Sequence, residues 1–564
     1  MKLLWKKEIR QGEEITPNQI VQLLIENRGI KNVDEFLNPP SPLNIKLEQF
    51  SKSFPASLKK VLKLLERIKK ENGTIVVYTD YDADGITGGA ILWETLHLLG
   101  FKTMPYVPHR VTEGYGFSLK GIDSVKKQFD PDLIISVDHG ITAEKKIAYA
   151  KSLGIPIVIT DHHLKSDTPP ASAFAVFHVP ELSGSGVAYF FAKAVFEHFS
   201  NIAMPAGRQE YGISNINQLR NYFKADYLTF ASIGTVADLV PLTGISRAVV
   251  KHGLAQFPKI RRVGIIELLK QAGIERKPIT TYEVGFIIAP RINAVGRLEH
   301  AIEALRLLCT NDKTKAQELT AKISKKNSER QDLVTQSVLE AEKIVIKKKL
   351  LNSKLLILYS DSWHEGVIGL IASKLVEKFY RPVIIMTKSG LNYKGSARSI
   401  PAFHMTNSLR EHKNLLIDVG GHAQAAGFTI ESKNLDKFIS ALTSFAAKKL
   451  TNEDLVKTVT ADIKLPISLI TKTLIDKLEQ LKPTGMGNPN PSFLSVVAIE
   501  KAYAMGKEQQ HLKFYSENGM EFVAFGKGDL LKSLSRGEVR EIVYCPELNE
   551  WNGNQRITCR VLHM

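Results

Sequence analysis

Cysteine is scarce in this sequence of 564 residues. The three cysteines, Cys309, Cys545 and Cys559, are widely separated, and none belongs to a Cys-x-x-Cys pair. This spacing indicates neither a disulfide framework nor a thiolate zinc site. No apolar run reaches the roughly 18 residues that a membrane span needs. The first residues contain too few apolar side chains for a secretory signal, so we expect a cytoplasmic protein with no membrane partner.

The charge balance is strongly one-sided. The chain has 75 Lys and Arg against 58 Asp and Glu, which gives a formal net charge of +17. A basic surface of this size attracts polyanions, because contacts to phosphates release bound counterions. A lysine-rich composition with no such role is the alternative explanation. The charge therefore favours a nucleic acid partner without deciding it.

The first half of the chain alternates predicted strands with predicted helices. Apolar, β-branched runs at 74–79, 132–137 and 155–160 indicate buried strands, and helical patterns follow the first two at 86–99 and 143–153. This alternation is typical of βαβ units and a mostly parallel sheet. A second α/β unit is predicted from strands at 354–359 and 382–386 around a helix at 367–379.

Two further regions differ in composition. Residues 311–350 are highly charged and lack glycine and proline, which predicts a long helix joining two lobes. From about residue 455 the chain has short β-rich runs, which predict a small barrel of the oligonucleotide-binding (OB) type. With about 150 residues per domain, the length suggests three to four domains. We expect the boundaries 1–50, 51–305, 306–350, 351–450 and 451–564.

Acidic residues follow the first predicted strand at alternating positions. Asp80, Asp82 and Asp84 cannot all be ionised at such close range unless cations offset their repulsion. Hard divalent ions with oxygen ligands provide this compensation. The spacing also resembles the opening of an EF-hand calcium loop, but Ile91 stands where that loop needs a bidentate glutamate.

Acidic and histidine residues also occur together in three other short segments of the chain. Asp138 and His139 follow the second predicted strand, and Asp161-His162-His163 end the third. Asp238 in the run 234–241 is a fourth candidate. One such cluster alone is more often a satisfied polar turn, but strand ends of a parallel sheet meet at one edge. We expect ligands from four strand ends to bind a pair of Mn²⁺ or Mg²⁺ ions, which clamp a phosphate and activate water.

These residues and their order resemble the RecJ family of the DHH phosphoesterase superfamily. The shared motifs of the superfamily core are DYDADG (80–85), SVDHG (136–140), DHH (161–163) and GTVADLVPL (234–242). Further RecJ-like motifs are PHRVTEGYG (108–116), SGSGVAY (183–189), PRINAVGR (290–297), WHEGVIG (363–369), GSARS (395–399), GGHAQAAG (420–427) and PTGMGNPNP (483–491). The resemblance extends from about residue 50 to the C-terminus.

The resemblance implies a DHH catalytic domain at 51–305, a DHH-associated domain at 351–450 and a nucleic-acid-binding OB fold at 451–564. It implies a 5′→3′ exonuclease that releases mononucleotides from single-stranded DNA by two-metal hydrolysis, in recombination and repair. Its candidate partners are the 5′ end of single-stranded DNA, a helicase and a single-strand-binding protein.

The resemblance also assigns roles to individual residues. The implied metal ligands are Asp82, Asp84, Asp138, His162 and Asp238. Asp80 holds the second ion or its water, or orients a ligand from behind. His163 faces the scissile phosphate and stabilises its developing charge. His422 either donates to a phosphate near the active site or is a packed histidine.

A 5′-end exonuclease must also bind the terminal phosphate. Arg110, Ser396 and Arg398 are the candidates, followed by Arg291, because guanidinium groups bind phosphate oxygens bidentately. Any single one of these arginines is alternatively an ordinary ion-pair residue. Close approach of backbone to DNA is expected at the glycine pair Gly420 and Gly421. Tyr115 is a candidate for base stacking, or a core aromatic.

The sequence departs from the family pattern in three places, none of which removes a ligand. His139 replaces a usual Cys, Val179 replaces a common Asn before Pro180, and 201–221 reads as a variable insertion. Two alternatives stay open. One is a DHH nuclease acting on RNA or short oligonucleotides, and the other is a non-catalytic DNA-binding scaffold, a class that loses metal ligands.

Overall fold

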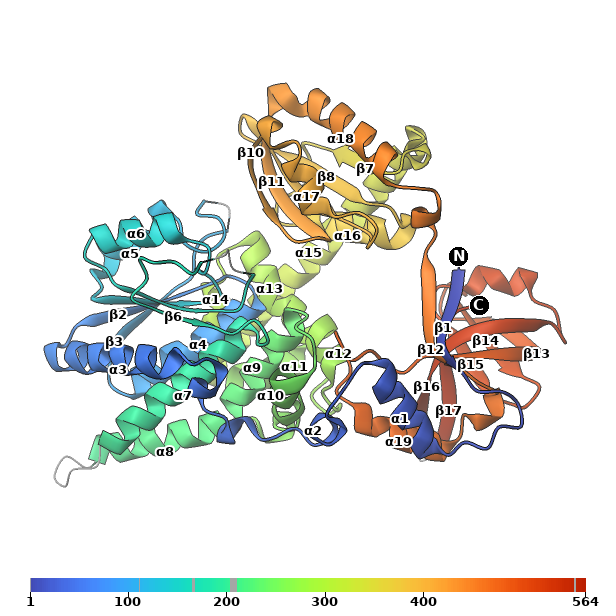
Figure 1. Cartoon of the computed structure of the whole chain (residues 1–564), viewed down its shortest axis with the longest axis horizontal. Coiled ribbons are helices and arrows are strands. Elements are labelled where there is room, and N and C mark those ends of the chain that lie inside the picture. Colours follow the sequence, from blue (N-terminus) through green and yellow to red (C-terminus); the bar gives the residue numbers. More distant parts are fainter. Residues whose placement is uncertain (1, 111, 165–167, 203–209, 552–553) are drawn as a thin grey trace. The chain divides into compact units, whose positions relative to one another are not determined.

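The structure is a computed structural model that describes residues 2–110, 112–164, 168–202, 210–551 and 554–564. The expected insertion at 201–221 therefore lies partly outside the described residues. The chain divides into two compact units. The first comprises Trp5–Ser324 and Thr460–Met564, and the second comprises Met1–Leu4 and Lys325–Val459. Figure 1 labels their helices and strands.

The first unit contains a five-stranded parallel sheet in the order β3-β2-β4-β5-β6. Its strands are β2 (Thr74–Thr79), β3 (Lys102–Tyr106), β4 (Leu133–Val137), β5 (Ile157–Asp161) and β6 (Ala175–His178). The predicted strands correspond to β2, β4 and β5, whereas β3 and β6 were not predicted. All five carboxyl ends lie at the same edge of the sheet, where ligands bind in open α/β folds.

Helices cover both faces of this sheet, so β2, β4 and β5 are buried along their whole length. On one face, Val77 and Ile135 pack in a core with α3 (Phe54–Glu71), α4 (Ala83–Leu98) and α7 (Gly184–Ile202). On the other face, Val76 and Ile134 pack against α5 (Leu119–Phe129) and α6 (Glu144–Ser152). This alternation follows from the two-residue period of a strand.

A helical region follows the sheet. Its elements are α8 (Glu210–Lys224), α9 (Asp226–Ala237), α10 (Gly244–Leu254), α11 (Val263–Gln271), α12 (Thr281–Glu283), the π-helical turn η4 (Val284–Ile288), α13 (Ala289–Leu298) and α14 (Ile302–Cys309). The predicted connecting helix is α15 (Lys313–Lys347), which runs from the first unit into the second. No helix in the described ranges is long and apolar enough to cross a membrane.

The second unit contains a five-stranded sheet in the order β10-β11-β9-β8-β7, in which only β7 and β8 pair in parallel. Its strands are β7 (Leu356–Tyr359), β8 (Val383–Ser389), β9 (Asn392–Arg398), β10 (Leu416–Gly421) and β11 (Ala425–Glu431). The helices packed with them are α16 (Ile368–Phe379), α17 (Met405–Arg410) and α18 (Leu435–Lys449). The predicted second α/β unit is present.

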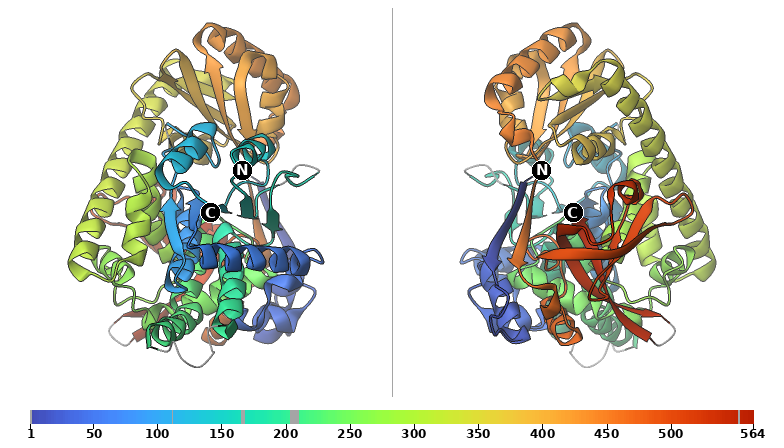
Figure 2. Two further views of the ribbon diagram at one scale, coloured as in Figure 1. Left: turned by 90° about the vertical axis from the view of Figure 1, so that its left-hand side faces the viewer. Right: turned by 90° about the vertical axis from the view of Figure 1, so that its right-hand side faces the viewer.

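The predicted barrel is also present, drawn in red in Figure 2. Five strands close on themselves in the order β13-β14-β15-β17-β16, because β16 pairs back with β13. They are β13 (Phe493–Met505), β14 (His511–Ser516), β15 (Glu521–Ala524), β16 (Val539–Trp551) and β17 (Asn554–His563), preceded by β12 (Thr458–Lys464) and α19 (Lys472–Leu478).

The N-terminal segment packs on this barrel. It forms β1 (Lys2–Glu8), which pairs with β12, followed by α1 (Pro17–Asn27) and α2 (Val33–Leu37). Leu24 and Phe36 belong to one hydrophobic core with Phe493 and Tyr544 of the barrel. Burial of these side chains, worth about 1.5–3 kcal/mol each, joins the two ends of the chain into one body.

Candidate active site

The loop between β2 and α4 carries three of the expected site residues. Asp82 is the N-cap of α4, and its Oδ1 accepts hydrogen bonds from the backbone N–H groups of Asp84 and Gly85, each at 3.0 Å. A carboxylate at this position satisfies helix donors that would otherwise lack partners. One oxygen of Asp82 is thus used by the helix, and the other is left for a ligand.

Asp84 is buried and held by the start of α7. Its Oδ2 accepts from Gly184 N at 2.6 Å, and its Oδ1 accepts from Ser185 N at 2.9 Å. A Cβ on Gly184 would lie 2.3 Å from Oδ1 of Asp138, so the site requires glycine there. The motif SGSGVAY therefore positions two of the expected ligands, a role that the sequence did not reveal.

Asp138 follows β4 in an unusual backbone conformation. Its φ of +68° lies in the left-handed region, which is uncommon for residues other than glycine but is adopted by aspartate more readily than by most. The bond from Asp138 N to Thr160 O, 2.9 Å long, ties this turn to β5. The Oδ1 atom of Asp138 is buried without a hydrogen-bond partner among the described residues.

His139 points away from the expected ligands. Its Nε2 lies 3.0 Å from the carbonyl oxygen of Tyr78, and the ring packs edge-on against Phe117 at 4.6 Å between centroids. Burial lowers the pKa of His139 to about 4, so the ring is neutral at physiological pH. It is in none of the groups of closely spaced ligand atoms found among the described residues.

The two histidines of the DHH motif face different partners. The Nε2 atom of His162 lies 3.2 Å from Oδ1 of Asp138 and 3.3 Å from Oδ2 of Asp238. The Nδ1 atom of His163 lies 2.9 Å from Oδ1 of Asp161, and the Tyr115 hydroxyl lies 3.0 Å from its Nε2. His162 thus belongs to the carboxylate cluster, whereas His163 is held beside it.

Asp161 fixes this arrangement from behind. Its Oδ2 accepts from Ile141 N at 2.9 Å, and its Oδ1 accepts from His162 N at 2.7 Å as well as facing the His163 ring.

Tyr115 was predicted as either a stacking or a core residue. Its side chain is 49% exposed and its hydroxyl contacts His163, so it belongs to the rim of the site.

The expectation that all four acidic groups lie at strand ends was wrong for Asp238. This residue is the C-cap of α9, with its N–H donating to Gly234 O at 2.9 Å. Helix α9 is buried on nearly all sides, so its sequence lacks the polar face that identifies a helix. The carboxylate still reaches the sheet edge, because α9 packs against α4 and α7.

The site concentrates negative charge in a buried place. Burial raises the pKa of Asp80, Asp82 and Asp138, and neighbouring carboxylates raise it further. Burial and the charge of Asp84 likewise raise the pKa of Asp238 to about 8. Such a group of carboxylates is stable in its ionised form only with bound cations.

Asp161 and His163, next to the carboxylate cluster, have pKa values shifted toward their charged forms. Burial opposes charge on both members, but the hydrogen bond and the mutual attraction of Asp161 and His163 outweigh it. The pKa of His163 is raised to about 9, and that of Asp161 falls below its usual range. Asp161 therefore favours the protonated form of the His163 ring.

The donor set fits a pair of divalent ions. Three groups have ligand atoms within 4.8 Å of one another: Asp138, His162 and His163; Asp84, His162 and Asp238; and Asp80, Asp82 and Asp138. Within the described ranges, Asp80 Oδ1, Asp138 Oδ1 and His162 Nε2 are buried without hydrogen-bond partners. Mixed carboxylate and imidazole donors suit Mn²⁺ or Mg²⁺.

Two of the expected phosphate-binding arginines belong to the same unit. The guanidinium carbon of Arg110 lies 5.1 Å from the centre of the Tyr81 ring, and its charge acts to lower the pKa of Asp80. Arg291 lies on α13, where its Nη1 donates to Ile287 O at 2.8 Å.

Asn293, on the same helix, accepts from Ala83 N at 2.7 Å and so holds the loop of Asp82 and Asp84. In the sequence, the only indication that Asn293 is important was its place in the motif PRINAVGR (290–297).

The remaining expected residues belong to the second unit. Ser396 and Arg398 share a face of β9, with 3.3 Å between Arg398 Nη1 and Ser396 Oγ. A Cβ on Gly369, near the start of α16, would lie 3.0 Å from that hydroxyl oxygen. Gly420 and Gly421 end β10, and His422 is exposed in the turn that follows.

Only glycine fits at position 421. Its φ is +138°, and a Cβ there would lie 2.3 Å from Ala425 O.

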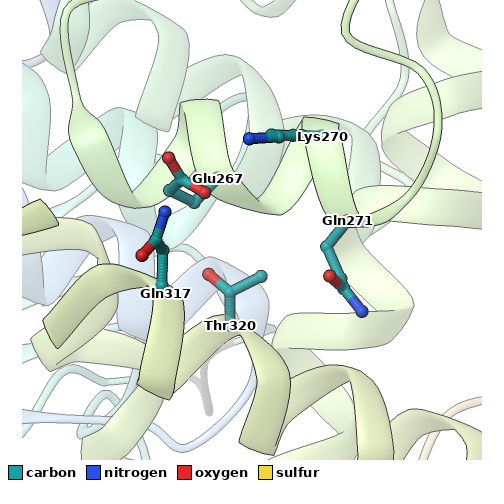
Figure 3. Close-up of a pocket in the computed structure, with 5 residues that line it drawn as sticks. All are labelled: Glu267, Lys270, Gln271, Gln317 and Thr320. Atoms are coloured by element: carbon teal, nitrogen blue, oxygen red, sulfur yellow. The ribbon is translucent and has the colours of Figure 1, made fainter. Parts of the chain in front are cut away.

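A polar pocket lies elsewhere, between α11 and the start of α15 (Figure 3). It is lined by Glu267, Lys270, Gln271, Gln317 and Thr320. None of these residues is in a group of closely spaced metal-ligand atoms. The groups that could hold metal ions among the described residues therefore lie at the sheet edge and not in this pocket.

Comparison with known proteins agrees with this geometry. Residues 74–227 match the family model described as DHH family, N-terminal domain, residues 352–448 match the DHHA1 domain, and residues 461–563 match the RecJ OB domain. The chain is 34% identical to the single-stranded-DNA-specific exonuclease RecJ of Bacillus subtilis, over 89% of this chain and 63% of that protein. The match thus spans less than two thirds of that relative.

Two other relatives are matched over more of their length. The Haemophilus influenzae protein of the same description is 30% identical over 99% of this chain and 98% of its own length. The crystal structure of RecJ in complex with Mn²⁺ from Thermus thermophilus superposes with a TM-score of 0.79 and 29% identity, covering 100% of this chain and 79% of that one. The carboxylate and histidine cluster, the three domain matches and this full-length similarity lead to one conclusion: the chain belongs to the RecJ family.

Proposed function

We propose that this protein is a metal-dependent 5′→3′ exonuclease that releases mononucleotides from single-stranded DNA, in recombination and repair. The observation that carries the proposal is the convergence of Asp84, Asp138, His162 and Asp238 at one buried place. The RecJ relatives are described as exonucleases specific for single-stranded DNA. The net charge of +17 favours a polyanionic substrate.

The proposed metal ligands are Asp82, Asp84, Asp138, His162 and Asp238, with Asp80 holding the second ion or its water. When bound, two Mn²⁺ or Mg²⁺ ions supply a hydroxide nucleophile at neutral pH and neutralise charge on the phosphate. The backbone donors of Gly184 and Ser185 orient Asp84, and Asp82 is oriented by its N-cap bonds. The protein itself holds these oxygens close together before the substrate binds.

His163 has a separate task in this proposal. Asp161 holds its ring on one side and keeps it protonated, with a pKa of about 9. A fixed cation beside the ligand cluster stabilises the negative charge that develops on the scissile phosphate. Tyr115 contacts the other ring nitrogen and limits rotation of the ring.

We further propose that the 5′-terminal phosphate is bound by Arg110, Ser396 and Arg398, with Arg291 as an additional contact. Arg398 and Ser396 present neighbouring donors, and both lie close to Gly369, near the start of α16. Helix N-termini and guanidinium groups are the usual donors to phosphate. Gly420 and Gly421 would allow close approach of the DNA backbone, and His422 would donate to a phosphate.

Substrate choice separates this proposal from its alternatives. Purified protein with Mn²⁺ should release labelled mononucleotide from 5′-labelled single-stranded DNA and should largely spare a duplex. Equal rates on RNA would favour a DHH nuclease for RNA or short oligonucleotides. No hydrolysis with any divalent ion would favour a non-catalytic DNA-binding scaffold.

Two consequences for the cell belong to the same proposal. An enzyme restricted to unpaired strands needs a helicase to expose them and meets single-strand-binding protein on them, so both are proposed partners. We propose a cytoplasmic location, in keeping with free thiols at Cys309, Cys545 and Cys559. Co-purification of tagged protein with a helicase, and its loss after nuclease treatment, would separate direct contact from contact through DNA.

A further inference from the structure

Two aromatic side chains lie exposed and stacked on the first unit. Tyr282 is 60% exposed and Phe286 is 71% exposed, with ring centroids 5.0 Å apart and planes inclined by 29°. Single exposed apolar residues are ordinary on protein surfaces. Two large aromatic rings presented together to solvent instead indicate a binding surface. We call Tyr282 and Phe286 the aromatic platform.

The backbone beneath the platform is irregular. Phe286 lies in the π-helical turn η4, where Ala289 N donates to Val284 O, five residues back. Such turns cost stability relative to a regular α-helix and occur often at functional sites. Val284 and Ile288 are buried in the domain core. The turn therefore anchors its apolar side firmly and holds Phe286 outward.

The segment that carries the platform packs against one element of the candidate active site and leads into another. Gly285 faces Val236 of α9, at 3.8 Å between its would-be Cβ and a Val236 methyl group, and α9 ends at Asp238. In the other direction η4 leads directly into α13, whose Asn293 holds the metal-binding loop at Ala83. The segment of the two rings thus contacts the helix that ends at Asp238 and leads into the helix that holds the loop of Asp82 and Asp84.

A further exposed apolar residue lies next to a proposed metal ligand in the chain. Leu239, next to Asp238, is 64% exposed and has a φ of +58°, in the left-handed region. This conformation is the usual ending of a helix, in which Val240 N donates to Thr235 O at 3.3 Å, and it turns the Leu239 side chain into solvent. Leu239 therefore adds exposed apolar surface directly beside the proposed ligand Asp238.

From these contacts we infer that the aromatic platform is a binding subsite for unpaired bases of the DNA strand whose backbone enters the active site. Bases of a single strand expose their faces and stack on protein aromatics regardless of sequence, whereas bases of a duplex are already stacked on each other. The inference rests on the proposed exonuclease function and adds residues that select the single strand.

The test uses the full chain and four variants of exposed residues. Tyr282→Ala with Phe286→Ala removes the rings, and Tyr282→Leu with Phe286→Leu keeps apolar bulk without an aromatic face. Ile266→Ala, an exposed apolar residue of α11, is the matched control. Tyr282→Phe with Phe286→Tyr keeps both rings. Equal melting temperatures establish that all four fold.

Two measurements on an oligothymidylate give the result. We expect KM with Mn²⁺ and the metal-free Kd to rise at least about fivefold in the Ala and Leu pairs, the lower end of the effect for one stacked base. The ring-exchange pair and Ile266→Ala should match the wild type, and kcat should change less than about twofold. An abasic strand of equal length should bind wild type and the Ala pair alike.

Other outcomes overturn the inference. An unchanged KM and Kd in the Ala pair would assign the surface to another partner. Wild-type affinity in the Leu pair would exclude base stacking. A wild-type protein that binds the oligonucleotide but releases no nucleotide would refute the proposed function, while the Kd comparison would still decide the platform.

Discussion

The two units place their candidate functional residues in opposite settings. In the first unit, Asp84 and Asp138 are almost completely buried, and backbone N–H groups hold Asp84 in place. In the second unit, Ser396 and Arg398 are half-buried and His422 is exposed. Buried, preorganised charge suits bond breaking, whereas accessible donors suit recognition of a substrate group. Under the proposed function, the first unit would carry the bond-breaking residues, and Ser396 and Arg398 of the second unit would contribute to recognition of the DNA end.

The same difference appears in the use of glycine. Gly184 is needed because a side chain would collide with Asp138, so its role is to bring two ligands together. Gly421 is needed because its φ is +138° and its backbone packs against Ala425, so its role is to shape a hairpin turn. Gly184 thus allows two proposed metal ligands to lie close together, whereas Gly421 shapes an exposed hairpin turn.

The largest effect should come from Asp138→Ala, which tests the first half of the comparison. Asp138 belongs to two of the three groups of ligand atoms, so its loss should disturb both ions. We expect kcat to fall by well over about 100-fold, since even residues behind metal ligands cost 10–100-fold. DNA affinity measured by fluorescence anisotropy should change less than about twofold. A variant that retained a tenth of its turnover would contradict the assignment.

A smaller effect is expected from Asp161→Asn. The carboxylate keeps the pKa of His163 raised to about 9, so the ring is cationic across the neutral range. Removing this charge lowers that pKa, and the alkaline decline of kcat should begin at a lower pH. At the optimum, kcat should fall about 10–100-fold, as for other orienting residues. An unshifted pH profile would show that His163 does not act as the cation.

Arg398→Ala tests the second half of the comparison. A charge-assisted hydrogen bond is worth about 1.5–3 kcal/mol, so kcat/KM for 5′-phosphorylated DNA should fall at least about tenfold. The rate on DNA with a 5′ hydroxyl should stay the same. The measurement is a competition between the two ends in one reaction. A variant that keeps its preference for the phosphorylated end would remove Arg398 from the pocket.

The smallest effect concerns stability without substrate. Because the pKa of Asp238 is raised to about 8, its folded form binds more protons than its unfolded form. Metal-free protein should therefore lose stability as pH rises from about 4 to about 8. Each of the two Mn²⁺ ions, at about 100 times its Kd, adds about 2.7 kcal/mol, so the melting temperature should rise by ~5 °C at pH 8. The rise in melting temperature should be smaller at pH 6, and in Asp138→Ala it should fall below half of the wild-type value.

Much of this architecture followed from local sequence patterns. Buried strands ending in Asp or His pointed to one sheet edge, because parallel strands end there together, and Asp80 to His163 are found at that edge. The connecting helix and the barrel had equally clear patterns. The motifs also indicated which residues to examine on the second unit.

The rest depended on contacts distant in sequence. Helix α9 is apolar all round because it is enclosed by other helices, so it did not read as a helix and Asp238 was placed at a strand end. The bonds from Gly184 to Asp84 and from Ala83 to Asn293 join residues about 100 and 210 positions apart. Periodicity carries no information on such pairs. The same holds for α1, whose apolar face packs on the barrel.

Calorimetric titration of the metal-free protein with Mn²⁺ tests the central claim most directly. Four carboxylates and His162, converged in one place, should bind two ions per chain, and Asp138→Ala should lose both or retain one weakly. Arg398→Ala should bind two ions as the wild type does. Fewer than two ions in the wild type, or two in Asp138→Ala with unchanged affinity, would contradict the account.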